Sequence, residues 1–174
     1  MRKMRLPFIL SFIMLLGLFS CTSTEQKEAT LQLKATAQGP FFAGPNSLMA
    51  EYSINPADLF DSEGLKKSDI EEVKLKSVSI DLAKSDSIAL DQFTSVSLSI
   101  VGGDEPMTAL AILNPIEGSN TPLTLTVSEE ADLAPFFQAD KVTFILDWDF
   151  ISDDYREEIN SQITLNLNAA LKSN

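Results

Sequence analysis

The sequence contains no histidine, and it has one cysteine and one tryptophan in 174 residues. Without an imidazole, the chain cannot build a Ser-His-Asp triad or a histidine metal site. A single cysteine also excludes an intrachain disulfide and a zinc site made of several thiolates. The groups that remain for catalysis are carboxylates, which are spread so widely that no pair stands out. The composition therefore favours a protein that is not an enzyme.

Basic residues are also few, with 13 Lys and Arg against 25 Asp and Glu and a formal net charge of −12. Three of the basic residues, Arg2, Lys3 and Arg5, lie at the very start of the chain. An acidic surface of this kind repels nucleic acid and anionic lipid head groups, and it favours cations or basic partners. We therefore expect no nucleic-acid partner.

The N-terminal segment combines these basic residues with an almost entirely apolar stretch at 6–19. That stretch is shorter than the roughly 20 apolar residues that a spanning helix needs, so it is typical of a secretory signal peptide, residues 1–20. The segment ends in Leu18-Phe19-Ser20-Cys21: an aliphatic residue, a position that tolerates several residue types, a small residue and then the cysteine. This pattern resembles the lipobox of bacterial lipoproteins.

The resemblance implies cleavage between Ser20 and Cys21 and attachment of fatty acyl chains, such as palmitate, to Cys21. Two or three acyl chains hold a protein stably on a membrane, at about 0.8 kcal/mol per buried CH₂. We expect residues 21–29 to be the acylated cysteine and a flexible tether, and 30–174 to be a single domain. Thr22 after the cysteine resembles outer-membrane lipoproteins, and the following TEQKE resembles surface-export signals of the Bacteroidota. The implied location is the cell envelope, anchored by lipid at the outer membrane, with the periplasmic or surface face left open; an ordinary secreted protein is the alternative.

Apolar and polar residues alternate with a period of two through most of the remaining chain, as in half-buried strands. Short helical turns are predicted at 56–60, 68–71 and 128–137, from a proline at a first helical position and from Ser-initiated caps. The strands are predicted at 31–35, 47–54, 73–82, 94–101, 107–113, 123–127, 141–151 and 159–171.

Two strands have further features. The alternation in 73–82 changes phase, which predicts a bulge near Lys76 and Ser77. The last strand, Ile159–Leu171, alternates strictly and is a candidate for an unpaired sheet edge.

About eight strands joined by short turns, with one or two helical turns and no βαβ spacing, favour an all-β fold. We predict an antiparallel β-sandwich, immunoglobulin-like or jelly-roll-like, because a second sheet would cover the apolar face of each strand. A barrel is the alternative.

The segment DWDFISDDY contains the densest group of acids, Asp147, Asp149, Asp153 and Asp154. Clusters of carboxylate oxygens can hold Ca²⁺, so these four residues are a candidate calcium site, and no other cofactor is expected. The alternative is a solvated acidic face.

Two phenylalanines, Phe41 and Phe42, stand between Gly-Pro pairs in GPFFAGP. They are candidates for contact with a ligand or partner; the alternative is a lid folded over the core. Trp148 shares its parity with neighbouring apolar residues and is predicted to lie in the core, which weakens a sugar-binding aromatic platform.

These observations together predict a non-enzymatic lipoprotein of the cell envelope, a binding or accessory module. Its expected partners are the membrane, through the lipid anchor, and an envelope protein or a small ligand. The alternatives are a carboxylate-based, glycosidase-like hydrolase, with two acids converging in a cleft, and a lipid carrier, with a large cavity between its sheets.

Overall fold

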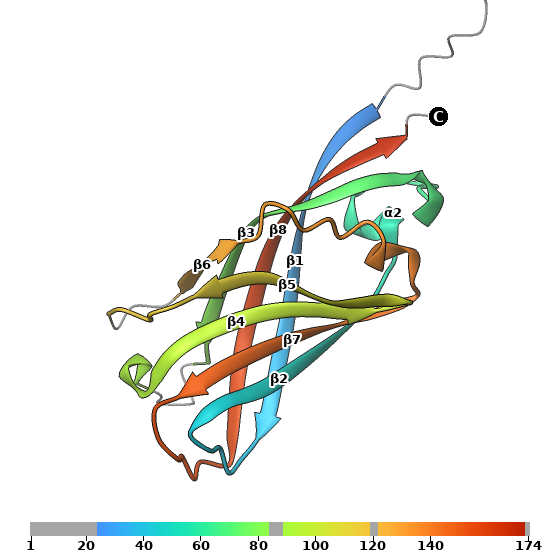
Figure 1. Ribbon diagram of the computed structural model, residues 1–174. Coiled ribbons are helices and arrows are strands. Elements are labelled where there is room, and N and C mark those ends of the chain that lie inside the picture. Colours follow the sequence, from blue (N-terminus) through green and yellow to red (C-terminus); the bar gives the residue numbers. More distant parts are fainter. Residues whose placement is uncertain (1–23, 84–88, 119–121, 173–174) are drawn as a thin grey trace, which may run out of the picture.

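A computed structural model of the chain describes residues 24–83, 89–118 and 122–172 (Figure 1). Its main elements are eight β-strands, and each overlaps a predicted one, so the all-β prediction is confirmed. The strands are β1 (Thr24–Gln38), β2 (Gly44–Ser53), β3 (Ile70–Leu82), β4 (Phe93–Gly102), β5 (Glu105–Leu113), β6 (Leu123–Val127), β7 (Lys141–Phe150) and β8 (Glu158–Lys172).

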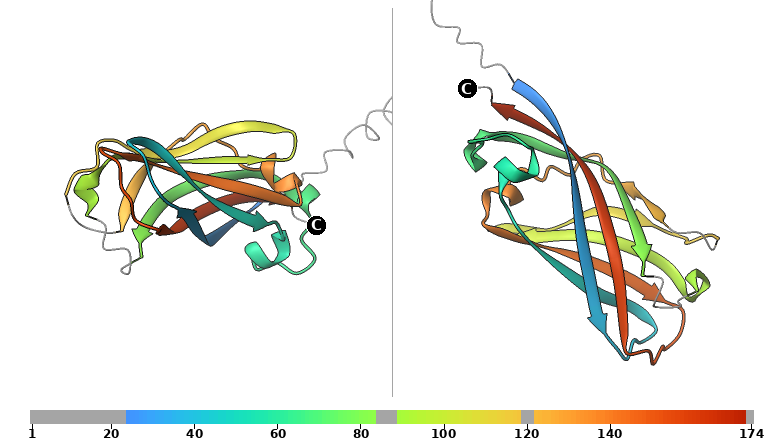
Figure 2. Two further views of the ribbon diagram at one scale, coloured as in Figure 1. Left: turned by 90° about the horizontal axis from the view of Figure 1, so that it is seen from below. Right: turned by 180° about the vertical axis from the view of Figure 1, so that it is seen from behind.

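The strands form one closed antiparallel barrel in the order β1-β2-β7-β4-β5-β6-β3-β8. β1, β8 and β3 lie on one side of it, and β2, β7, β4 and β5 lie on the other, as the front and back views show (Figures 1 and 2). Two short contacts close the ring: β1 and β2 share the pair Thr36–Met49, and β5 and β6 share two pairs.

The prediction of a β-sandwich is therefore wrong. A sandwich and a barrel both bury one face of every strand, so both produce the same alternation of apolar and polar residues. Only the pairing of strands that are distant in sequence separates the two architectures. Here β3 pairs with both β6 and β8, and β1 with both β8 and β2, so the sheet closes on itself.

The bulge predicted in β3 is confirmed by a shift in its register with β8 between Leu75 and Ser77. A tight turn joins the antiparallel strands β4 and β5, and in it Gly103 has φ 61°, a conformation that glycine adopts without strain. An extra residue at a bulge sharpens the local twist and bend of a strand, which helps a sheet to curve into a barrel.

The helical turns are short: α2 (Pro56–Leu59), η1 (Lys67–Asp69), η3 (Leu90–Gln92) and η4 (Phe136–Gln138). The first two lie where turns were predicted. The turn predicted for 128–137 is wrong over most of its length, because Asp132 pairs with Lys74 of β3 in an isolated β-bridge and helical structure begins only at Phe136. None of the described helices has the length and apolar character that crossing a lipid bilayer requires.

Two predictions about the ends of the chain differ from the structure. The flexible tether was expected to extend to Ala29, but Thr24–Ala29 already belong to β1 and pair with Ala170 and its neighbours in β8. The strand Ile159–Leu171 was a candidate edge, but β8 lies between β1 and β3 and is paired on both sides. One side of β8 is polar because its side chains face outward from the barrel, and its backbone is hydrogen-bonded to a neighbouring strand on both edges.

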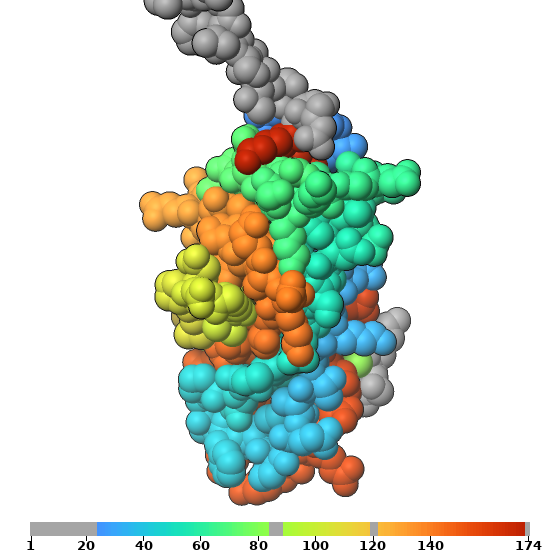
Figure 3. All heavy atoms as spheres, turned by 90° about the vertical axis from the view of Figure 1, so that its right-hand side faces the viewer, coloured from blue at the N-terminus to red at the C-terminus, as the bar shows by residue number. Residues whose placement is uncertain are grey.

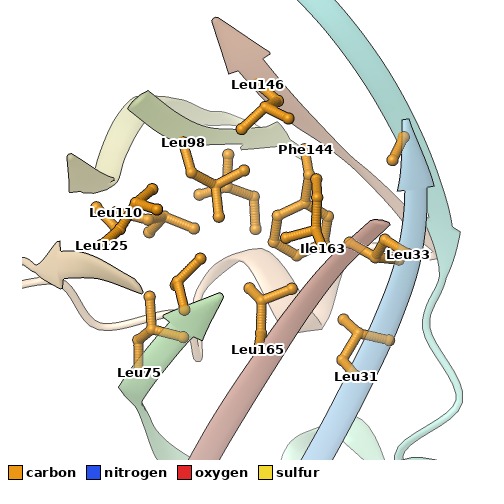
Figure 4. Packing of buried hydrophobic residues seen from close by; sticks show 14 of the residues in the cluster. Leu31, Leu33, Leu75, Leu98, Leu110, Leu125, Phe144, Leu146, Ile163 and Leu165 are labelled. Carbon is orange, nitrogen blue, oxygen red and sulfur yellow. The ribbon is translucent and has the colours of Figure 1, made fainter. Parts of the chain in front are cut away.

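The interior of the barrel is filled by inward residues of all eight strands. Figure 4 shows part of this cluster, and the side chains labelled there, from β1 and from β3 to β8, point toward a common centre. Trp148 is fully buried there, as predicted, and its Nε1 donates a hydrogen bond to Ser161 Oγ at 3.2 Å. Ser161 is a polar residue buried in the described core, and this hydrogen bond from Trp148 satisfies its hydroxyl group there.

Candidate functional site

Two loops form the end of the barrel opposite the start of β1, and we call them the distal tip: residues 39–43 and 151–157 (Figure 1). Phe41 and Asp154 join the loops through two backbone hydrogen bonds, of 2.8 and 2.9 Å. The Gly39 amide adds a third bond, to the Glu157 carbonyl at 2.8 Å. In Figure 3 the two loops make up the lower end of the molecule. The tip is thus one hydrogen-bonded unit.

The two phenylalanines of the tip have opposite environments. Phe41 is 2% exposed and stacks on Phe150 of β7, with ring centroids 5.4 Å apart. Phe42 is 60% exposed. Phe41 therefore covers the end of the core, whereas Phe42 presents its ring to solvent.

The backbone that carries Phe42 is held by the side chain of Asn46. The Phe42 amide donates to Asn46 Oδ1 at 3.2 Å, and Asn46 Nδ2 donates to the Phe42 carbonyl at 2.7 Å and to the Gly44 carbonyl at 2.9 Å. Gly44 has φ 97°, a value that favours glycine. The exposed ring therefore belongs to a residue whose backbone amide and carbonyl are both hydrogen-bonded within the loop.

Two more large apolar side chains of the tip are exposed, Ile151 at 58% and Tyr155 at 78%. With Phe42 they make up half of the large exposed apolar side chains in the described part of the chain. Single exposed apolar side chains are common on protein surfaces, whereas several of them close together indicate an interaction site.

The four acids of the candidate calcium site have separate protein partners. Asp147 accepts a hydrogen bond from the Ser47 hydroxyl, and Asp149 Oδ2 accepts one from Thr94 Oγ1 at 2.7 Å. Asp153 Oδ1 accepts from the Ala43 amide at 2.9 Å.

Asp154 forms an ion pair with Arg156, whose Nη2 lies 2.6 Å from Asp154 Oδ2 and whose Nε lies 2.9 Å from Oδ1. Both side chains are largely buried, at 16% and 21% exposed. The hydrogen bonds from Arg156 hold the pKa of Asp154 below its ordinary value, although burial acts in the opposite direction. The Arg156 guanidinium also bonds Gln92 Oε1 at 3.1 Å, so the pair links the tip to η3.

Among residues 24–83, 89–118 and 122–172, no group of three or more acidic, cysteine or histidine side chains is placed to share a metal ion. Of the four candidate acids, Asp153 and Asp154 bind groups of the distal tip, and Asp147 and Asp149 bind hydroxyl groups on the outer wall of the barrel. Cys21 and Ser20, the predicted lipidation and cleavage positions, lie outside the described residues.

A second surface lies on the outer wall of β1, β8 and β3, which face the viewer in the right-hand panel of Figure 2. Three registered rows cross these strands, and we call them the polar face. The rows are Thr30–Asn166–Ser77, Gln32–Thr164–Ser79 and Lys34–Gln162–Asp81.

Each outer row of the polar face borders a hollow. The larger, of about 400 Å³, is lined by Lys34, Asp81, Gln162 and their neighbours Leu82, Ala83, Asn160 and Ser161. The smaller, of about 280 Å³, is lined by Glu28, Ala29, Thr30, Lys76, Ser77, Asn166 and Leu167. Each of these two linings contributes one carboxylate, Asp81 at the larger hollow and Glu28 at the smaller one.

Sequence reasoning missed the polar face and Arg156. The wet side of β8 was visible in its alternation, but its matching rows on β1 and β3 depend on registers that no local pattern encodes. Arg156 could have been noticed as the basic residue two positions after Asp154 in an acidic segment.

Comparison with known proteins gives little further information. No family model matches the chain, and no curated protein matches it. A solved structure, "Structure of Turnip Yellow Mosaic Virus at 100 K", is similar over 87% of this chain and 96% of that one, at 11% identity and a TM-score of 0.29. A likeness this distant carries no argument about function.

Proposed function

We propose that the chain is a lipid-anchored lipoprotein of the cell envelope, at the outer membrane, and that its barrel is a non-enzymatic binding module. The leader and the Leu18-Phe19-Ser20-Cys21 pattern support the anchor. The exposed apolar residues of the distal tip support binding, and they are the observation on which the proposal rests.

The position of the anchor would determine how the barrel is presented. β1 begins at Thr24, three positions after Cys21, and three extended residues reach at most about 10 Å. The 15 residues of β1 then extend for roughly 45–50 Å toward the tip. An acylated Cys21 would therefore hold one end of the barrel close to the lipid and direct the tip away from it.

The chemistry of the tip favours a protein partner. Phe42, Ile151 and Tyr155 offer apolar and aromatic contact area, the type enriched at the centres of interfaces. Asp153 and Glu157 are exposed beside them, and the whole chain is acidic. The matching surface is an apolar depression with a basic rim, because opposite charges steer association and select the partner. Since the tip is already ordered, binding would cost little conformational entropy.

The anchor is tested by growing cells with a clickable palmitate analogue and comparing the wild type with Cys21→Ser. We expect label and membrane fractionation for the wild type only; equal labelling of the two would refute the anchor.

The tip is tested separately with a photo-crosslinking phenylalanine analogue at position 42, and with the same analogue at Met107, an exposed position on β5, as the control. We expect a discrete adduct from position 42 that disappears in the double variant Ile151→Ser, Tyr155→Ser. Equal adducts from both positions, or an adduct that survives the double variant, would refute the tip as the binding surface.

A further inference from the structure

We propose that the polar face is a binding site for a neutral, linear oligosaccharide, on a surface separate from the distal tip. The middle and larger-hollow rows contain six polar side chains. In the described structure, no hydrogen bond or ion pair with another protein group engages any of them. They are Gln32, Thr164, Ser79, Lys34, Gln162 and Asp81.

The remaining row shows what these side chains do when they meet a partner. Thr30 Oγ1 donates to Asn166 Oδ1 at 2.9 Å, and Asn166 Nδ2 donates to Ser77 Oγ at 2.8 Å. That row is satisfied within the protein. The middle row and the row at the larger hollow have polar side chains in the same registered geometry, but their donors and acceptors are available to a ligand.

The charge of the polar face selects a neutral ligand. Between its two ends, Gln32, Thr164 and Ser79 carry no charge, although the chain as a whole carries −12. Lys34 and Asp81 stand on either side of Gln162 and cancel each other in net charge. Amide and hydroxyl side chains both donate and accept hydrogen bonds, as the hydroxyl and acetamido groups of sugars do.

The spacing of the hollows selects an oligomer. Gln162 at the larger hollow and Asn166 at the smaller one are four residues apart on β8, which is on the order of 13 Å along an extended strand. A single sugar ring would occupy one hollow, whereas a chain of rings would cross the middle row and reach both. Solvent-exposed hydrogen bonds are individually weak because water competes for them, so binding should depend on how many rows the ligand covers.

The test uses the purified full-length chain in detergent and β-1,4-linked N-acetylglucosamine oligomers from monomer to hexamer, measured by isothermal titration calorimetry. We expect affinity to rise at least tenfold from the dimer to the oligomer that spans both hollows, and to level off beyond it. Millimolar oligomers that give no heat, or affinity that does not change with length, would overturn the proposal.

The double variant Gln162→Ala, Thr164→Ala should weaken binding of the hexamer at least tenfold. The matched control is Ser97→Ala, Thr143→Ala, which removes polar groups from the outer wall of β4 and β7 on the other side of the barrel. Circular dichroism and thermal unfolding establish that both variants remain folded. A loss of binding that is equal in the two double variants would overturn the site, whatever the result of the palmitate labelling.

Discussion

The adjacent residues Phe41 and Phe42 offer a matched test of the structure of the distal tip. Each is replaced by alanine in turn, and the free energy of unfolding is measured by urea titration. The chemical change is the same in both variants and the positions are neighbours, so any difference reports the environment of the ring. Phe41 is 2% exposed and stacked on Phe150, whereas Phe42 is 60% exposed.

The magnitudes follow from burial. Removing a buried phenylalanine ring costs about 3–5 kcal/mol of unfolding free energy, through lost transfer energy and the cavity that remains. The same truncation at an exposed position is usually within about 0.5 kcal/mol of neutral. At roughly 2–4 °C per kcal/mol for a domain of this size, Phe41→Ala should lower Tm by about 6–20 °C and Phe42→Ala by about 2 °C or less.

The contrast between the two variants is the decisive quantity. A cost below about 1 kcal/mol for Phe41→Ala would mean that this ring does not cover the core. A cost for Phe42→Ala equal to that of Phe41→Ala would mean that the Phe42 ring is buried. Phe41→Leu, which retains most of the apolar volume, should recover part of the loss and excludes a general intolerance of the loop to substitution.

Three further predictions concern the groups that fasten the tip and the core. Because the pKa of Asp154 is lower in the folded protein, its carboxylate stabilises the fold above the unfolded pKa, and this stabilisation is lost as pH falls through the folded pKa. Arg156→Gln should therefore reduce the loss in Tm on acidification, measured by thermal unfolding at a series of pH values. Identical pH profiles for the wild type and the variant would contradict this. Gly39→Ala should destabilise by about 1–3 kcal/mol or more in urea unfolding, because the added Cβ would lie 2.0 Å from the Arg156 carbonyl oxygen; an unchanged midpoint would refute the close approach. Ser161→Ala should cost about 1–3 kcal/mol by leaving the Trp148 indole N–H unpaired, and fluorescence follows this directly, since Trp148 is the only tryptophan; a neutral variant would show that the indole has another partner.

The strands were predictable because each alternates between one buried and one exposed face. In β8, Ile163 and Leu165 face the core while Thr164 faces out, and the sequence alone shows this pattern. The bulge in β3 was predictable for the same reason, since a change of phase must be repaired somewhere. Closure of the barrel was not predictable, because it depends on pairings such as Thr36 with Met49, between strands whose patterns would be equally satisfied in a sandwich.

The candidate sites were harder to predict because their geometry depends on contacts between distant segments. Nothing local distinguishes Phe41 from Phe42; the difference arises where Phe41 meets Phe150 across the barrel end. Likewise, Asp153 is one of four acids in sequence, but in the structure it caps the Ala43 amide of the opposite loop. Such roles follow from tertiary pairing, which the local pattern does not contain.

The central position of β8 connects the stability of the barrel with the proposed oligosaccharide site. Its inward residues, such as Ile163, pack in the core, and its outward residues, Gln162 and Thr164, form the middle of the polar face. Because side chains alternate strictly along a strand, a shift of one residue would exchange these two sets, so the pairing of β8 with β1 and β3 fixes the core and the polar face together. Substitutions on the outward positions leave the core untouched, since the side chains of Gln162 and Thr164 face outward and make no hydrogen bond to another protein group in the described structure, while their backbones stay paired in the sheet. A loss of sugar binding in Gln162→Ala, Thr164→Ala at unchanged Tm would therefore report the surface itself, whereas no inward substitution in β8 could separate binding from folding.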